Sequence, residues 1–151
     1  MIRKSAGAVI FRKEAGKIYY LLLQYSPIGR TDKDYWGFAK GTIEQGERTI
    51  DTIKREIKEE TGLENLRFIR GFRISERYFF RAEGETIFKT VFYLLGQTKE
   101  KEIKISFEHK GFVWLEFPEA YKRLSFKGAK EILRKANNYL HTLIKNGQLR
   151  I

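Results

Sequence analysis

The apolar and polar positions of the chain divide it into segments of strand and helix length. Two apolar runs, within residues 4–13 and 17–26, have the length and composition of strands, and a short turn at Glu14, Ala15 and Gly16 separates them. Residues 26–35 are polar and predict a surface loop. The aromatic segment 35–39 then predicts a brief strand.

The middle of the chain changes to helical spacing and back. Ile50, Ile53 and Ile57 recur at that spacing, which predicts a helix over residues 48–61 with Gly62 placed to end it. Residues 71–81 and 86–97 predict a long hairpin around the segment 82–85.

The last third predicts one strand, at residues 112–117, followed by two helices. Pro118 fits the first turn of a short helix, and Ser125 is placed to cap a longer one. The apolar stripe of the longer helix contains Ala129, Ile132, Leu133, Ala136, Leu140 and Leu143. These elements predict one α+β domain over residues 1–151, with a mixed sheet flanked by helices.

Composition narrows the class of protein. With 42% hydrophobic and 32% charged residues among 151, the chain has the profile of a soluble globular protein. No apolar run approaches the roughly 20 residues of a membrane span, and the N-terminus lacks the layout of a signal peptide, so we expect no membrane partner and a cytoplasmic location. Cysteine is absent, which excludes disulfides, thiolate metal sites and cysteine nucleophiles. Abundant Lys, Glu, Arg and Ile, with Met1 the only methionine, resemble proteins adapted to high temperature.

The chain is strongly basic, with 30 Lys and Arg residues against 19 acidic residues and a net charge of +11. Long-range attraction then favours an anionic partner such as a nucleotide, a polyphosphate or RNA. A basic surface without a specific partner would explain the charge equally well.

Against this charge, three glutamates gather on the predicted helix. Glu56, Glu59 and Glu60 have i, i+3 and i+4 spacing and share one face, turned about 100° from the isoleucine stripe. Clustered carboxylates suit a hard divalent cation such as Mg²⁺. A solvated face would be the alternative, its glutamates paired with the neighbouring cations Lys54, Arg55 and Lys58.

The residues around the glutamates resemble the signature of the Nudix hydrolase family. The matching residues are Gly41, Glu47, Arg55, Glu56, Ile57, Glu59, Glu60, Gly62 and Leu63. A chance match at one starting point is on the order of one in a billion. The resemblance implies an α/β/α sandwich and hydrolysis of a nucleoside diphosphate linked to another group.

The resemblance also implies roles for individual residues. Glu56, Glu59 and Glu60 would bind Mg²⁺ or Mn²⁺, with the carbonyl of Gly41 as a further ligand. Arg55 would pair with Glu47 and hold the loop against the helix.

One carboxylate would accept a proton from the attacking water. Three candidates for this base stay open: Glu59, Glu56 and Glu108 of a later loop. We expect His109, beside Glu108, to lie on the surface or behind the site rather than to bind metal.

Ordered segments between about Ser5 and Leu140 are similar to the asymmetrical diadenosine tetraphosphate hydrolases. They are 5–11, 21–26, 35–47, 89–95, 106–117 and 124–140. This similarity implies adenine stacking by Tyr93 and Tyr139, and phosphate contacts by Lys40 and Lys89. Without it, the two tyrosines would be core residues and the two lysines solvated surface groups.

The chain departs from that pattern at Ala39, Thr42 and Gln45, where proline, histidine and proline are usual. Arg30 and Lys33 of the predicted loop are placed to shape an altered pocket. The sequence therefore predicts Mg²⁺-dependent cleavage of diadenosine tetraphosphate to ATP and AMP. The alternatives are a Nudix pyrophosphohydrolase acting on RNA 5′ ends, nucleoside triphosphates or ADP-ribose, and an inactive nucleotide-sensing module.

Overall fold

The computed structural model describes residues 1–27 and 33–150, which form one mixed sheet between helices. The strands are β1 (Ile2–Glu14), β2 (Lys17–Tyr25), β3 (Tyr35–Gly37), β4 (Ala39–Thr42), β5 (Arg67–Ala82), β6 (Glu85–Gln97) and β7 (His109–Leu115). The helices are α1 (Thr49–Thr61), α2 (Phe117–Arg123) and α3 (Lys127–Lys145). None of the helices in this described part of the chain is long and apolar enough to cross a membrane.

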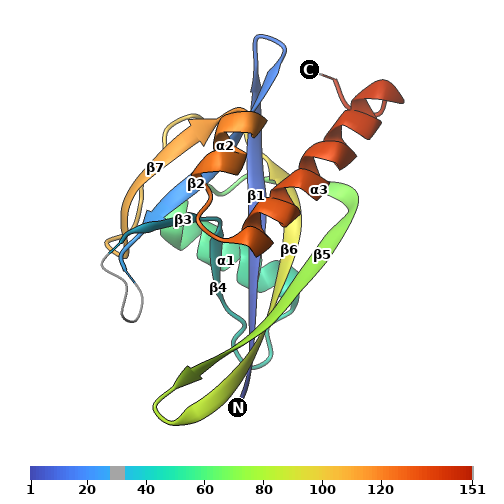
Figure 1. Cartoon of the computed structure of the whole chain (residues 1–151). Helices are drawn as coiled ribbons and strands as arrows, with labels where there is room; N and C mark the ends of the chain where they lie inside the picture. Colours follow the sequence, from blue (N-terminus) through green and yellow to red (C-terminus); the bar gives the residue numbers. More distant parts are fainter. Residues whose placement is uncertain (28–32, 151) are drawn as a thin grey trace.

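The sheet has the order β3-β2-β1-β6-β5, and β1 pairs with β6 in parallel. Strand β1 changes its antiparallel partner along its length, because residues 5–8 pair with β4 and residues 11–14 pair with β2. Helix α1 covers one face of the sheet, while α2 and α3 cover the other (Figure 1). The predicted mixed sheet between helices is confirmed.

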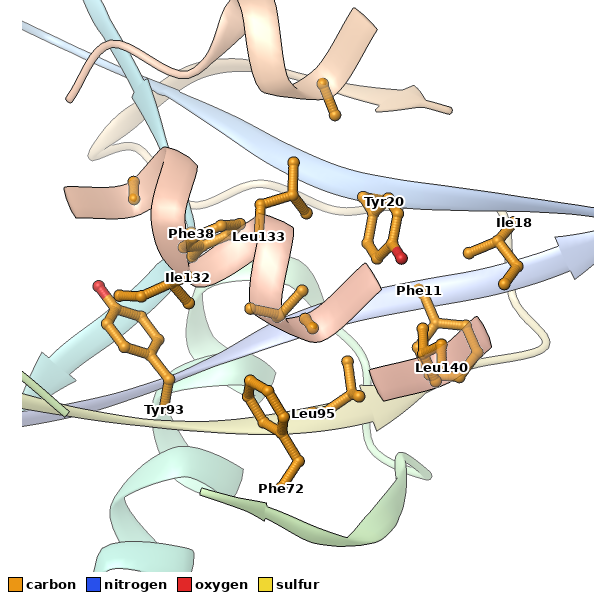
Figure 2. Close-up of a cluster of buried hydrophobic side chains, with 14 of the residues drawn as sticks. Phe11, Ile18, Tyr20, Phe38, Phe72, Tyr93, Leu95, Ile132, Leu133 and Leu140 are labelled. Atoms are coloured by element: carbon orange, nitrogen blue, oxygen red, sulfur yellow. The ribbon is translucent and has the colours of Figure 1, made fainter. Parts of the chain in front are cut away.

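Alternation along β1 supplies both faces with core residues. Ala8 and Ile10 pack toward α1 with Ile53 and Ile57, whereas Val9 and Phe11 join the cluster beneath α3. Figure 2 shows Phe11 beside Leu140 and, further along the same cluster, Tyr93, Phe38 and Ile132. Ile50, the first residue of the predicted isoleucine stripe, is only half-buried.

Two tight turns shape the long hairpins. The residues at the tips, Ala15–Gly16 and Glu83–Gly84, have positive φ angles between 51° and 78°, which match the right-handed twist of the flanking strands. The predicted helix over 48–61 is confirmed as α1, which Gly62 ends in the left-handed conformation at φ 78°. The β5–β6 hairpin extends beyond the rest of the sheet (Figure 1).

Several predicted boundaries were wrong. Residues 35–39 belong to two short strands, because β3 pairs with β2 whereas β4 pairs with β1, and Phe38 between them is buried in the core. Strand β7 spans 109–115 instead of 112–117, since Phe117 already belongs to α2. Ser125 does not cap α3: Phe126 holds the cap position, and the Ser125 hydroxyl accepts a hydrogen bond from the Trp36 N–H at 2.8 Å. Of the two cations expected to shape the pocket, Arg30 lies outside the described residues.

Candidate functional site

The end of β4 lies directly against α1. A Cβ atom on Gly41 would fall 1.9 Å from the Glu56 carboxyl carbon and 2.2 Å from its Oε1, so only glycine leaves room for this carboxylate. The close approach brings the Gly41 backbone and the Glu56 side chain into contact. These are the first glycine and a helix glutamate of the signature described above.

Arg55 ties the loop before α1 to the helix. Its Nε and Nη2 donate to the two oxygens of Glu47 at 2.8 and 2.9 Å, and Nη2 also donates to the Thr42 carbonyl at 3.1 Å. The hydrogen bonds from Arg55 lower the pKa of Glu47 to about 2. The same guanidinium reaches α1 itself, since its Nη1 donates to Glu56 Oε1 at 2.7 Å. The expected Arg55–Glu47 pairing is therefore present.

The three helix glutamates do not share one exposed rim. The side chain of Glu59 is 59% exposed, that of Glu56 is 15% exposed and that of Glu60 only 5%. Glu60 turns inward, where its Oε1 lies 3.3 Å from Nε2 of His109. Helical spacing places the three carboxylates on one side of α1, but only Glu60 is buried against His109, so their environments differ.

Two of these carboxylates, Glu56 and Glu60, are partly withdrawn from water. Desolvation raises the pKa of Glu56 and of Glu60, although Arg55 and His109 partly oppose the shifts. The Oε2 atom of Glu60 is buried and has no hydrogen-bond partner among the described residues. A buried orphaned carboxylate oxygen beside further carboxylates is a donor set that fits a hard divalent cation.

The described side chains do not form a complete set of metal ligands. Within residues 1–27 and 33–150, no three His, Cys, Asp or Glu side chains gather closely enough to form one. Arg55 instead occupies the carboxylate face, with its Nη1 3.7 Å from Glu59 Oε2 as well as in contact with Glu56. A cation bound by the glutamates would therefore compete with this guanidinium.

The loop before β7 reaches the same place. Glu108 is exposed, and its charge contributes to raising the pKa of Glu56, after desolvation and Glu59. Of the two positions expected for His109, at the surface or behind the site, the structure shows the second: His109 is buried with its Nε2 3.3 Å from Glu60, and its ring meets that of Tyr25 edge-on at 4.6 Å. The structure thus brings the third candidate base, Glu108, to the helix glutamates.

A cavity of about 610 Å³ opens beside Lys40, the neighbour of Gly41. Lys40, Lys89 and Tyr93 all line it, so the structure joins three of the four predicted substrate-binding residues. Burial lowers the pKa of Lys40, and burial together with the charge of Lys40 lowers that of Lys89. Two partly desolvated cations in one cavity favour an anionic ligand.

Aromatic rings form most of the remaining cavity wall. They belong to Tyr25, Tyr35, Phe38, Tyr78, Phe80, Tyr93 and Phe126. Tyr93 is only 2% exposed and packs edge-on against Phe38, so it belongs to the core as well as to the cavity (Figure 2). Tyr78 is 37% exposed and is the more accessible ring for stacking on a base.

Tyr139, the fourth predicted substrate-binding residue, is not among the residues that line this cavity. Its hydroxyl donates to the Arg70 carbonyl at 2.6 Å, and a Cβ on Gly71 would lie 2.2 Å from that hydroxyl. In this structure, Tyr139 fastens α3 to the irregular start of β5.

The sequence analysis missed Glu76 and Tyr78, although a signal for them was present. Tyr78 pairs with Lys89 and Ile74 with Tyr93 across the hairpin, so every second residue between them faces the cavity side. In the predicted hairpin, the residues of 71–81 that share a face with Lys89 and Tyr93 alternate along the strand. Following this alternation would have identified Glu76 and Tyr78.

Comparisons with known proteins agree with this geometry. A family model described as NUDIX domain matches residues 1–136. The bis(5'-nucleosyl)-tetraphosphatase [asymmetrical] of Mus musculus is 34% identical over 150 residues, which cover 93% of this chain and 97% of that protein. A crystal structure of a C. elegans Ap4A hydrolase binary complex has a TM-score of 0.78 and 32% identity, covering 93% of this chain and 98% of that one. The RNA pyrophosphohydrolase of Bartonella clarridgeiae is 34% identical over only 70 residues, 45% of this chain and 40% of that protein.

Proposed function

Because the chain belongs to the Nudix hydrolase family, we propose that it cleaves diadenosine tetraphosphate asymmetrically into ATP and AMP with Mg²⁺ as its metal. Nudix hydrolases generally use divalent metals, and the oxygen-rich donor set around α1 supports such a metal here. Similarity to asymmetrical tetraphosphatases over 93% of the chain supports the choice of substrate.

One observation carries the proposal: the cavity with Lys40 and Lys89 begins at the residue next to Gly41, where Glu56 packs. A long anionic ligand can therefore lie on the two lysines while its phosphates reach the carboxylates of α1. The aromatic wall supplies surface for a base at the other end of that ligand.

The reaction joins a water oxygen to the phosphorus next to one adenosine. The bridging P–O bond on the far side breaks, AMP and ATP separate, and the proton of the water passes to a carboxylate. The chemistry that a bound divalent cation supplies is neutralisation of phosphate oxygens and a lower pKa for the attacking water.

The chain's own residues divide the remaining work. Lys40 and Lys89 hold the phosphates by charge-assisted hydrogen bonds. Glu56, Glu59 and Glu60, with the Gly41 carbonyl, would hold the metal, and Arg55 fixes the loop that carries this glycine. Glu59, Glu56 and Glu108 are the candidates for the base, and variants of each separate them.

RNA is the less favoured substrate. The sequence places four basic residues near its C-terminal end that could form an RNA-binding face: Arg123, Lys127, Lys130 and Arg134. Two of them form polar contacts within the protein, because Lys130 donates to the Tyr121 carbonyl and Arg134 pairs with Glu131 at 2.7 Å. The similarity to an RNA pyrophosphohydrolase also covers less than half of the chain.

A product analysis tests the proposal. The protein is incubated with Mg²⁺ and, in separate reactions, with diadenosine tetraphosphate, ADP-ribose, nucleoside triphosphates and triphosphorylated RNA. We expect ATP and AMP from the tetraphosphate to form fastest, and no turnover after chelation of the metal. Two ADP molecules per tetraphosphate, or a faster reaction with RNA or ADP-ribose, would refute the assignment.

A matched pair of variants tests the site. Glu59→Gln should lose most turnover with an unchanged Tm, whereas Glu119→Gln, an exposed glutamate on α2, should behave as the wild type. Full activity of Glu59→Gln would contradict its place in the metal site.

A further inference from the structure

Glu76 is a carboxylate inside a cavity that is otherwise built for an anion. It lies on β5, lines the cavity with Lys40 and Lys89, and its charge raises the pKa of both lysines against the effect of burial. Phosphates would be repelled by this residue, so its presence needs a reason other than phosphate binding.

The side chain of Glu76 lies against the start of α3, with its carboxylate oxygens available to accept hydrogen bonds. A Cβ on Gly128, in the first turn of α3, would fall 1.7 Å from Glu76 Oε1, so the carboxylate lies over the start of that helix. The free N–H groups and the dipole at a helix N-terminus favour a carboxylate there. Among the described residues, none forms an ion pair or a side-chain hydrogen bond with Glu76.

An ionised carboxylate can only accept hydrogen bonds, so its ligand must present donors. Guanine presents two adjacent donors, N1–H and the N2 amine, which match the two oxygens of one carboxylate. Adenine presents its N6 amine beside the acceptor atom N1, so the second oxygen would face a lone pair. The aromatic rings of the cavity would stack on either base without distinguishing them.

We propose that Glu76 reads the edge of the base in this cavity and favours guanine over adenine, so that diguanosine tetraphosphate is a better substrate than diadenosine tetraphosphate. This inference rests on the proposed function for the reaction that is catalysed, whereas the preference for a base is argued from Glu76 alone. The inference places the base beside the phosphate-binding lysines, because Glu76 and Tyr78 line the same cavity as Lys40 and Lys89 and Tyr78 is paired with Lys89 across the hairpin.

Binding of ATP and GTP, measured by calorimetry with Mg²⁺, tests the inference separately from catalysis. A bidentate pair between a side chain and a base discriminates by about tenfold, so GTP should bind wild type about tenfold more tightly than ATP. Glu76→Gln keeps the volume but replaces one acceptor with a donor, and should abolish or reverse this preference. The control is Glu85→Gln, which removes an exposed carboxylate at the start of β6 and should keep the wild-type preference.

A second variant moves Glu76 without removing its charge. Gly128→Ala would push the carboxylate away from α3, because the added methyl group needs its space, and should also reduce the preference for GTP. Equal binding of ATP and GTP by the wild type would overturn the inference, and so would an unchanged ratio of the two affinities in Glu76→Gln. Failure of the wild type to bind either nucleotide would overturn it as well.

Hydrolysis of the two tetraphosphates separates this inference from the proposed function. Diadenosine and diguanosine tetraphosphate are compared by kcat/KM with the same variants. Cleavage to ATP and AMP without discrimination between bases would refute only the role of Glu76. Discrimination in binding without any cleavage would refute only the proposed reaction.

Discussion

Replacing Gly41 by alanine tests whether the contact between β4 and α1 sets the position of a reacting carboxylate. The new Cβ would lie 1.9 Å from the Glu56 carboxyl carbon. Non-bonded carbon atoms rest about 3.5 Å apart, so the carboxylate must move by about 1.5 Å. A displacement of about 1 Å at a reacting group can cost about 10²-fold in rate. The alanine keeps the Gly41 carbonyl, so the loss would come from Glu56.

The assay is kcat and KM for diadenosine tetraphosphate with saturating Mg²⁺, together with thermal unfolding. We expect kcat to fall about 10²-fold and KM to change little, because Lys40 and Lys89 stay in place. Gly96→Ala is the control, since its Cβ would meet Leu66 at an ordinary 3.4 Å. Turnover of Gly41→Ala within about threefold of wild type would show that the Glu56 position does not limit catalysis.

Three further predictions concern the site and its surroundings. Arg55→Lys loses the two-pronged contact with Glu47 and should weaken activation by Mg²⁺ by about 10- to 100-fold in a metal titration; an unchanged titration would show that the pairing is dispensable. Tyr139→Phe loses the hydrogen bond to Arg70 and should cost about 1 kcal/mol, or about 2–4 °C in Tm. A large rise in KM with an unchanged Tm would instead favour the stacking role implied by sequence similarity. Burial raises the pKa of Tyr35 from 10.0 to about 12, and a folded state that holds protons more tightly than the unfolded one loses stability as pH rises between these values. Denaturant unfolding across that range should show the loss, and constant stability would contradict it.

Local patterns in the sequence were sufficient for helix α1 and for the Arg55–Glu47 pairing. Helix α1 was predictable because Ile53 and Ile57 record its buried face and Gly62 supplies the left-handed cap, both of which are local properties. The Arg55–Glu47 pair was predictable from the family signature, whose fixed spacing reflects one loop geometry.

Properties that depend on distant parts of the chain could not be predicted in the same way. Glu60 is buried against His109, which lies far along the sequence at the start of β7. The position of Tyr139 depends on the bulge at Gly71, which no pattern near residue 139 records. Ser125 has the composition of a helix cap, but a backbone N–H from β3 binds its hydroxyl instead.

The helix carboxylates and the hairpin residues of the cavity come from separate pieces of the chain. The loop before α1 and α1 itself carry the carboxylates, whereas the β5–β6 hairpin carries Glu76, Tyr78 and Lys89 and is joined at its outer end by only a two-residue turn. Amino-acid changes on the cavity face of the hairpin would therefore alter the cavity without replacing any carboxylate of α1. Such a division lets related proteins evolve new nucleotide preferences while they inherit an unaltered hydrolytic apparatus.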